Sequence, residues 1–391
     1  MNDFKDDISM DCIELTKKLV NFSSVTPLSL GCIEYIAQFL ENLGFEAHVV
    51  KFGSGAKEVT NLYAVYRNGG KNICFAGHID VVPTGPVENW QHAPFEAKIA
   101  DGKLYGRGTV DMKGAIAAML SCVQEVIFAL KQDNKPGSIS FLLTSDEEGD
   151  AIYGLDPMVK WLEEKGEKLD FCIIGEPTYH ESFGDVLQIG RRGSVTFQLE
   201  IFGTQGHAAY EDYLDTPSVT IKILNDLINL SLDDGDEVFV ASKLKIISLD
   251  IPYIASNVIP GKATISLNIR YNNLQSSDKL QQICENIIQK YHNNFTLTKL
   301  YDNVLPFVCD KNISYIQDFA QIVTKEIGQM PKFLTSGGAS DGRFIVKLCP
   351  VLEFGLANNM AHKIDEYLLI EDLQKLARIY RNFLLQCFSA R

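Results

Sequence analysis

The chain lacks any Cys-x-x-Cys pair, although it contains nine cysteines in 391 residues. Their number is odd and several fall inside apolar stretches, a pattern typical of reduced thiols in a protein core. The chain also has no run of eighteen apolar residues, and its amino terminus has no basic segment followed by an apolar one. These absences predict a cytoplasmic protein that neither spans a membrane nor is exported.

A basic tract is also missing. The formal net charge is −14 and the isoelectric point is about 5.0. Acidic residues are spread along the whole chain, so nonspecific attraction to nucleic acid is not expected. Apolar residues make up 46% of the chain, and this length favours two domains over one.

Acidic and imidazole side chains recur just after short, strand-like apolar runs. Such runs are typical of strands buried on both faces of a sheet, and in open α/β sheets functional groups gather at the carboxyl ends of the strands. The groups placed in this way are His78 and Asp80 after 73–77, Glu147 and Glu148 after 139–144, Glu176 after 171–174, and His362 after 351–356. Asp111 instead follows a glycine-rich stretch and precedes a helix-like one.

This mixture of groups suits a pair of metal ions. Zinc accepts imidazole and carboxylate, one carboxylate can bridge two ions about 3.5–4 Å apart, and bound water then has a pKa near ~7. A carboxylate free of metal must move the proton, so we expect Glu147 to be the general acid/base and Glu148 a ligand. Asp80 shares a strand face with His78 and is expected to support its imidazole. Taken singly, each residue is better explained as a structural or surface group; their conjunction predicts a two-metal hydrolase site.

Four segments resemble the motifs of the M20 metallopeptidase and deacylase family. They are Gly-His-Ile-Asp at 77–80, Arg-Gly-Thr-Val-Asp-Met-Lys-Gly at 107–114, Asp-Glu-Glu-Gly at 146–149 and Gly-Glu-Pro at 175–177. The resemblance implies that His78 and Glu176 hold one metal ion, that Glu148 and His362 hold the other, and that Asp111 bridges them. It also implies a cis peptide bond after Asp111. Zinc is expected at both positions, and cobalt or manganese would accept the same ligands.

Alternating segments predict an α/β catalytic domain, at 1–192 and 304–391, with a mixed central sheet covered by helices. Between its two parts, residues 193–303 change to period-two alternation, as in Val195, Phe197 and Leu199. The order read there is βαββαβ, which predicts an inserted ferredoxin-like domain. In the family such an insert is a lid and a dimer interface, so the resemblance implies a homodimer. It further implies that His207 reaches the partner subunit's site as an oxyanion donor, although a histidine of this kind is by itself more often structural.

Further segments at 188–194, 336–344 and 362–366 are similar to those of family members that remove succinate from a diamino dicarboxylic acid. Arginine can bind such a small polycarboxylate through two parallel hydrogen bonds. Arg192, at the domain junction, and Arg270, at the end of an insert strand, are candidates for this contact, with Arg191 as a further one. The resemblance implies further substrate contacts from Tyr210, Asn257, Gly338 and Asn358. In two places the chain departs from this pattern: Ala339 stands where a threonine is usual, and Glu211-Asp212 replaces Pro-His. Both departures concern the choice of substrate.

The sequence therefore predicts a metal-dependent hydrolase acting on the succinyl amide of a diamino dicarboxylic acid. Two other activities would use the same metal ions, namely removal of a different acyl group, such as acetyl from ornithine, and cleavage of di- or tripeptides. A third alternative is a metal-binding dimeric scaffold without catalysis. The presence of both Glu147 and Asp111 argues against that scaffold.

Overall fold

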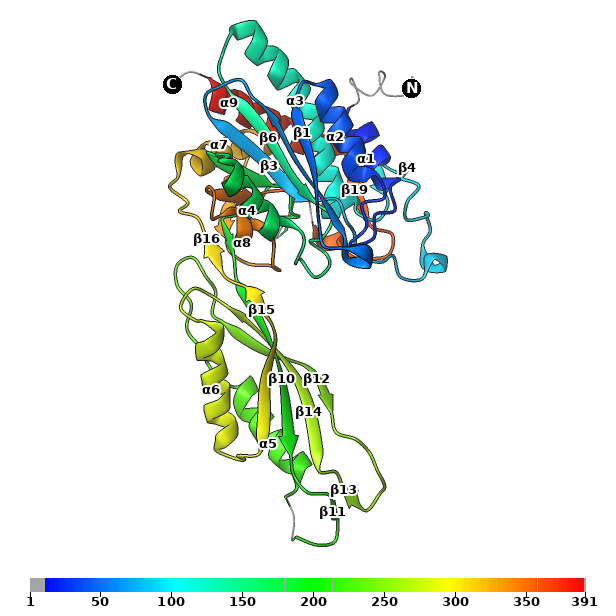
Figure 1. Cartoon of the computed structure of the whole chain (residues 1–391), viewed down its shortest axis with the longest axis vertical. Coiled ribbons are helices and arrows are strands. Elements are labelled where there is room, and N and C mark those ends of the chain that lie inside the picture. Colours follow the sequence, from blue (N-terminus) through cyan, green and yellow to red (C-terminus); the bar gives the residue numbers. More distant parts are fainter. Residues whose placement is uncertain (1–10, 179–180, 212–213, 357, 390–391) are drawn as a thin grey trace. The chain divides into compact units, whose positions relative to one another are not determined.

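The computed structural model describes residues 11–178, 181–211, 214–356 and 358–389 (Figure 1). The chain forms two compact units. The first comprises Met1–Gly190, Cys309–Leu334 and Ser340–Arg391, and the second comprises Arg191–Val308 and Thr335–Ala339.

The first unit is built on an eight-stranded mixed sheet. Strands β3, β6, β7 and β18 run parallel to one another in its middle, and β1 and β2 are antiparallel at one edge. Every residue of β2, β3, β6 and β7 is buried, which is why these strands are continuous apolar runs in the sequence. In sheet order the strands are β1 (Glu46–Phe52), β2 (Val59–Tyr66), β6 (Ser138–Thr144), β3 (Asn72–His78), β7 (Phe171–Ile174), β18 (Val351–Glu353), β8 (Val186–Gln188) and β17 (Lys332–Leu334).

Helices cover this sheet, and three of them, α1, α3 and α9, pack against one another. The apolar stretch Thr109–Asp133, which contains α3, is long and apolar enough to cross a membrane by composition alone. However, 72% of its most apolar window is buried inside the protein, as in a core helix. The helices of this unit are α1 (Cys12–Val20), α2 (Cys32–Asn42), α3 (Gly114–Asp133), α4 (Leu155–Lys165), α7 (Ser314–Ile327), α8 (Gly342–Ile345) and α9 (Ile370–Phe388).

Other short strands of the chain form two smaller sheets, and one of these strands, β16, belongs to the second unit. A three-stranded sheet is formed by β4, β5 and β19, and the two-residue strands β9 and β16 pair with each other. The bounds are β4 (Lys98–Ala100), β5 (Lys103–Tyr105), β19 (Tyr367–Leu369), β9 (Gly190–Arg191) and β16 (Phe307–Val308), with the short turns η2 (Gly55–Lys57), η3 (Val87–Asn89), η4 (Thr109–Lys113) and η5 (Asn358–Met360). The mixed α/β architecture with a large mixed sheet confirms the predicted fold class of this part of the chain.

The second unit is a four-stranded antiparallel sheet with two helices on one face (Figure 1). Alternate residues of β10, Val195, Phe197, Leu199 and Ile201, are fully buried against helical side chains such as Ile223 and Leu280. Sheet order is β12 (Lys243–Asp250), β14 (Lys262–Tyr271), β10 (Gly193–Phe202) and β15 (Phe295–Val304), and the helices are α5 (Thr216–Ile228) and α6 (Ser277–Gln289). A small pair, β11 (Gly206–His207) with β13 (Val258–Ile259), escaped the sequence analysis because two-residue strands carry no periodicity.

A cluster of polar side chains surrounds the half-buried Asp233 in this second unit. The carboxylate of Asp233 accepts hydrogen bonds from the backbone N–H of Ser242 at 3.0 Å, from the side chain of Asn272 at 2.7 Å and from that of Gln275 at 3.1 Å. Burial alone would raise the pKa of Asp233, but these bonds outweigh it and lower the pKa to about 2. The carboxylate is therefore more strongly ionised in the folded chain than in an unfolded one.

Candidate metal centre

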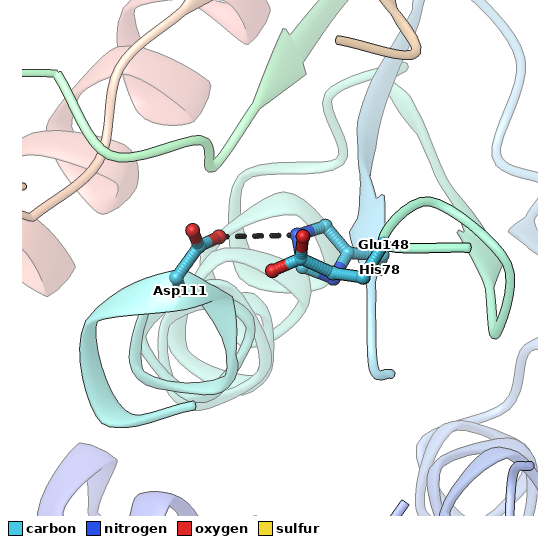
Figure 2. A group of neighbouring side chains, drawn as sticks. All are labelled: His78, Asp111 and Glu148. Atoms are coloured by element: carbon cyan, nitrogen blue, oxygen red, sulfur yellow. Dashed lines mark hydrogen bonds and ion pairs between the residues drawn. The ribbon is translucent and has the colours of Figure 1, made fainter. Parts of the chain in front are cut away.

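His78 ends strand β3, and its ring is almost fully buried. Its Nδ1 lies 2.9 Å from the backbone oxygen of Asp80. Because a carbonyl oxygen only accepts hydrogen bonds, Nδ1 carries a proton and the lone pair of a neutral ring is on Nε2. Figure 2 shows this Nε2 facing the carboxylate of Asp111, whose Oδ1 lies 3.1 Å away.

Asp111 projects from the irregular turn η4, just before α3. The peptide bond between Asp111 and Met112 is cis, as the resemblance implied. Met112 then lies against two glycines that precede metal-ligand candidates, because a Cβ atom at Gly77 would be 2.1 Å from its Cε and one at Gly175 would be 2.7 Å from it. The glycines before His78 and Glu176 thus let this turn approach the ends of β3 and β7.

The two oxygens of Asp111 face two different histidines. His78 Nε2 lies 3.1 Å from Oδ1 and 3.7 Å from an oxygen of Glu176. His362 Nε2 lies 3.2 Å from Oδ2 and 2.8 Å from an oxygen of Glu148. These nitrogen–oxygen distances of 2.8–3.7 Å suit ligand atoms that surround a common cation, each with a metal–ligand distance of about 2.0–2.2 Å. This pattern matches the expected bridging role of Asp111, which stays a prediction.

Other groupings of these donors are also close. The ligand atoms of His78, Asp111 and Glu148 lie within 4.8 Å of one another, and so do those of His78, Glu147 and Glu176. Glu147 is therefore near enough to bind metal itself. We favour Glu148 as the ligand because its carboxylate is the one that His362 contacts, and Glu147 as the proton carrier.

The charges at this centre strongly perturb one another. Burial would raise the pKa of Asp111, but its contacts with the imidazoles of His362 and His78 lower it well below its usual range. The hydrogen bonds of His362 to Asp111 and Glu148 raise its pKa to about 10. Burial, followed by the charge of Glu176, raises the pKa of Glu147 well above its ordinary value. Several carboxylates lie close together around two imidazoles, and divalent cations would stabilise this arrangement because they offset the repulsion between the negative charges.

Asp80 lies beside His78, but its carboxylate bonds elsewhere. One oxygen accepts from the N–H of Glu147 at 3.3 Å and the other from the N–H of Glu148 at 3.1 Å, while the nearer oxygen is 3.6 Å from His78 Nδ1. The side chain is fully buried. Asp80 thus holds the turn that carries Glu147 and Glu148, in addition to lying next to the imidazole that it was predicted to support.

Comparison with known proteins agrees with this geometry. The family model described as Peptidase family M20/M25/M40 matches residues 74–386. The chain belongs to the M20 peptidase family. Proteins named succinyl-diaminopimelate desuccinylase are 45% identical in Orientia tsutsugamushi (strain Ikeda), with 95% of each chain covered, and 42% identical in Ehrlichia canis (strain Jake), with 98% of this chain and 100% of the relative covered.

Solved structures of M20 proteins share the fold at low sequence identity. The metallo-carboxypeptidase Sso-CP2 of Sulfolobus solfataricus has a TM-score of 0.77 at 18% identity, with 97% of this chain and 99% of that one covered. YXEP of Bacillus subtilis, described as a dinuclear metal binding peptidase, has a TM-score of 0.68 at 14% identity, with 97% and 98% covered. The prediction of a hydrolase of this family is confirmed, and the candidate site is compatible with the metal binding expected of it.

The predicted oxyanion donor His207 lies beside two of the predicted substrate residues, Tyr210 and Asn257, in the second unit of this M20 chain. His207, at β11, pairs with Val258 of β13, and its Nε2 lies 3.4 Å from Nδ2 of Asn257. The Tyr210 ring centroid is 5.3 Å from that of His207. All three side chains are exposed. The structure therefore groups them, and their roles stay predictions.

Two predicted arginines form a separate group in the same unit. Burial lowers the pKa of Arg192 and Arg270, and for Arg270 the charge of Arg192 lowers it further. Among the groups that the structure describes, no acidic side chain offsets either cation, and the buried Nε of Arg192 has no hydrogen-bond partner. Arg191 instead donates to the backbone oxygen of Ser336 at 3.2 Å.

The remaining predicted contacts are less defined. Gly338 is exposed, and a Cβ atom there would have no neighbour within 4 Å. Asn358 begins the turn η5, and its side chain lies outside the described part of the chain, as does Asp212 of the unusual Glu211-Asp212 pair.

Sequence reasoning did not single out Asp341, although it lies in the 336–344 segment. It is buried, and neither carboxylate oxygen has a hydrogen-bond partner within the described ranges. Burial raises its pKa to about 6, and its charge adds to the effects that raise the pKa of Glu147. A buried acid in a glycine-rich loop, with an arginine two residues later, was the signal available.

Proposed function

We propose that this M20 protein is a metal-dependent amide hydrolase that cleaves N-succinyl-LL-2,6-diaminopimelate to succinate and LL-2,6-diaminopimelate. This activity would place it in diaminopimelate and lysine biosynthesis, and we propose the cytoplasm as its location. One observation carries the choice of substrate. Relatives bearing the desuccinylase name are 42–46% identical to this chain and cover 95–98% of it.

The donor set supports two divalent cations, which we propose to be zinc, with cobalt or manganese able to take the same positions. Such ions would polarise the amide carbonyl. They would also lower the pKa of bound water, so that hydroxide forms and can attack the carbonyl carbon. Glu147 is proposed to take the proton from that water and return it to the departing nitrogen. Burial raises the pKa of Glu147, so this carboxylate would hold the proton between these two steps more firmly than a solvent-exposed one.

Asp80 fixes the turn that carries Glu147, because its carboxylate accepts hydrogen bonds from two successive N–H groups of that turn. Precise placement matters, because an error of about 1 Å in a reacting group can cost roughly 10²-fold in rate. We propose that His207 of a second copy donates to the oxygen on which negative charge develops.

Arg192 and Arg270 are proposed to bind the substrate's carboxylates. Two half-buried guanidinium groups without a described acidic partner favour an anionic ligand, since burying like charges side by side is costly. Planar carboxylates can accept two parallel hydrogen bonds from arginine. This argument supports a polycarboxylate over a neutral acyl or peptide substrate.

The second unit is also proposed to form a homodimer interface and to act as a lid. Its edge strand β12 and the loop that follows expose apolar side chains, with Ile247 63% and Tyr253 83% accessible. Exposed edges and apolar groups of this kind favour pairing with another chain.

A substrate panel tests the proposed function. The purified protein, with its metal content measured, is assayed on succinyl-diaminopimelate, acetylornithine, and di- and tripeptides. We expect kcat/KM to favour succinyl-diaminopimelate by on the order of 10²-fold or more. A preference for acetylornithine or peptides would reject the substrate and keep the family chemistry. No hydrolysis of any substrate by protein holding two metal ions would instead favour the scaffold.

A further inference from the structure

A fully buried ion pair lies behind the candidate metal centre. Arg107 Nη1 is 2.7 Å from Oε2 of Glu366, and the two side chains are 2% and 0% exposed. These residues are 259 positions apart in the chain. The antiparallel pairing of β5 with β19 brings them together, since Tyr105 is opposite Tyr367 and the N–H of Gly106 continues the ladder by donating to the backbone oxygen of Glu366 at 2.8 Å.

The glutamate side of this pair holds the turn of Asp111. While Oε2 of Glu366 accepts from Arg107, Oε1 accepts from the N–H of Val110 at 2.9 Å and from that of Asp111 at 3.4 Å. Both oxygens of one carboxylate are therefore committed. The backbone from which the shared Asp111 carboxylate projects cannot shift without breaking these bonds.

The arginine side holds the loop of His362. Its Nη1 also donates to the backbone oxygen of Lys363 at 3.1 Å, and its Nη2 donates to that of His362 at 3.3 Å. His362 has a φ of +64°, in the left-handed region that non-glycine residues seldom occupy. Such a conformation persists only where surrounding groups enforce it. The guanidinium, which also lies 5.2 Å from the centre of the Trp90 ring, supplies that constraint.

Stability alone is a poor explanation for this arrangement. Removing two charges from water is costly, so a buried ion pair often contributes no more to stability than apolar side chains of the same volume. What apolar side chains could not do is bond to the amide of Asp111 and to the carbonyl of His362 at once. These are the two segments whose side chains meet, with His362 Nε2 at 3.2 Å from Oδ2 of Asp111.

We propose that Arg107 and Glu366 are positioning residues that fix His362 relative to Asp111, and so set the affinity of the metal position these two share with Glu148. The proposal rests on the two-metal site of the proposed function but not on the identity of its substrate. Arg107 Nη2 also donates to the backbone oxygen of Pro83 at 3.4 Å, but in the described part of the chain neither Arg107 nor Glu366 bonds directly to His78 or Glu176. The effect should therefore be selective.

Cobalt titration of the full-length, metal-free protein tests this. Co²⁺ binding is followed by calorimetry and by visible absorption, and a His362→Ala variant identifies which binding step belongs to the His362 position. In Arg107→Lys and Glu366→Gln we expect that step to weaken by about 10–100-fold, the usual range for groups that orient a ligand. The other step should change by less than about threefold, and only the absorption band of the His362 position should shift.

The matched control is Arg67→Lys. Arg67 pairs with Glu167 at 2.5 Å in the same unit, with no described contact to a metal-ligand candidate. It should leave both steps unchanged. Arg107→Lys keeps the buried charge balanced, so it carries the test if Glu366→Gln does not fold. Native affinities and spectra in Arg107→Lys, with or without a lower melting temperature, would overturn the proposal. Failure of the unaltered protein to bind two ions would count against the two-metal site, whereas two ions without desuccinylation would count against the substrate alone.

Discussion

The carboxylate of Asp80 offers a sharp test of how the catalytic turn is held. Asp80→Asn keeps the shape of the side chain but replaces one oxygen with an NH2 group. That group would face either the N–H of Glu147 or the N–H of Glu148, which now donate to the two oxygens at 3.3 and 3.1 Å. Two donors cannot bond to each other, so one backbone N–H loses its partner.

The size of the effect follows from those bonds. A hydrogen bond to a charged group contributes about 1.5–3 kcal/mol, and an unpaired buried donor costs about 1–3 kcal/mol. Removing a fully buried charge recovers part of this, because burial raises the pKa of Asp80 and so disfavours its ionised form. We expect the free energy of unfolding to fall by about 1–3 kcal/mol. Displacement of the Glu147 turn should lower kcat by roughly 10²-fold while KM changes little.

The assay combines urea unfolding with steady-state kinetics on succinyl-diaminopimelate at saturating metal. Asp170→Asn is the control, because Asp170 accepts from the N–H of Asn72 at 2.7 Å, at the opposite end of β3. It should lose stability with unchanged kcat. If Asp80→Asn were destabilised as calculated but retained native kcat, the turn would not depend on these bonds and the reasoning would fail.

Three further outcomes are expected. Glu147→Gln should still bind two metal ions, as measured by elemental analysis, but lose about 10²–10⁴-fold or more in kcat; native turnover would remove Glu147 as the base. Arg270→Ala should raise KM for succinyl-diaminopimelate with little change in metal content, and an unchanged KM would exclude it from carboxylate binding. Asp233 has a lowered pKa of about 2, so its stabilising effect is complete above the unfolded value near ~3.9 and is lost as pH falls toward the folded value. Urea midpoints should therefore fall between about pH 4 and pH 2, by the equivalent of about 1–2 kcal/mol, and Asp233→Asn should flatten this slope.

The sequence alone predicted that several site residues lie at the carboxyl ends of the central strands. In the parallel pairs, His78 lies opposite Thr144, and Cys74 lies opposite Cys172. Strands β3, β6 and β7 therefore end close to one another, and the polar residues that follow them must gather there. Because a strand buried on both faces is apolar throughout, these ends are visible as the points where apolar runs stop.

The prediction that His362 lies beside these strand ends rests on a different kind of argument. His362 Nε2 contacts Glu148 across 214 residues of chain, and no periodicity in the sequence encodes that contact. The prediction came from the family resemblance. For the same reason, the β11 and β13 pair that groups His207 with Asn257 was missed.

What the sequence determined by itself is thus which side chains follow buried strands, and the alternation that separates an antiparallel second unit from the first. Only the tertiary structure decided hydrogen-bond partners: that Asp80 bonds to the turn of Glu147, and that Arg107 and Glu366 join the segments of His362 and Asp111. The reason is physical. Periodicity reflects burial, which is local to each strand or helix, whereas the partner of a buried charge depends on the register between segments far apart in the chain.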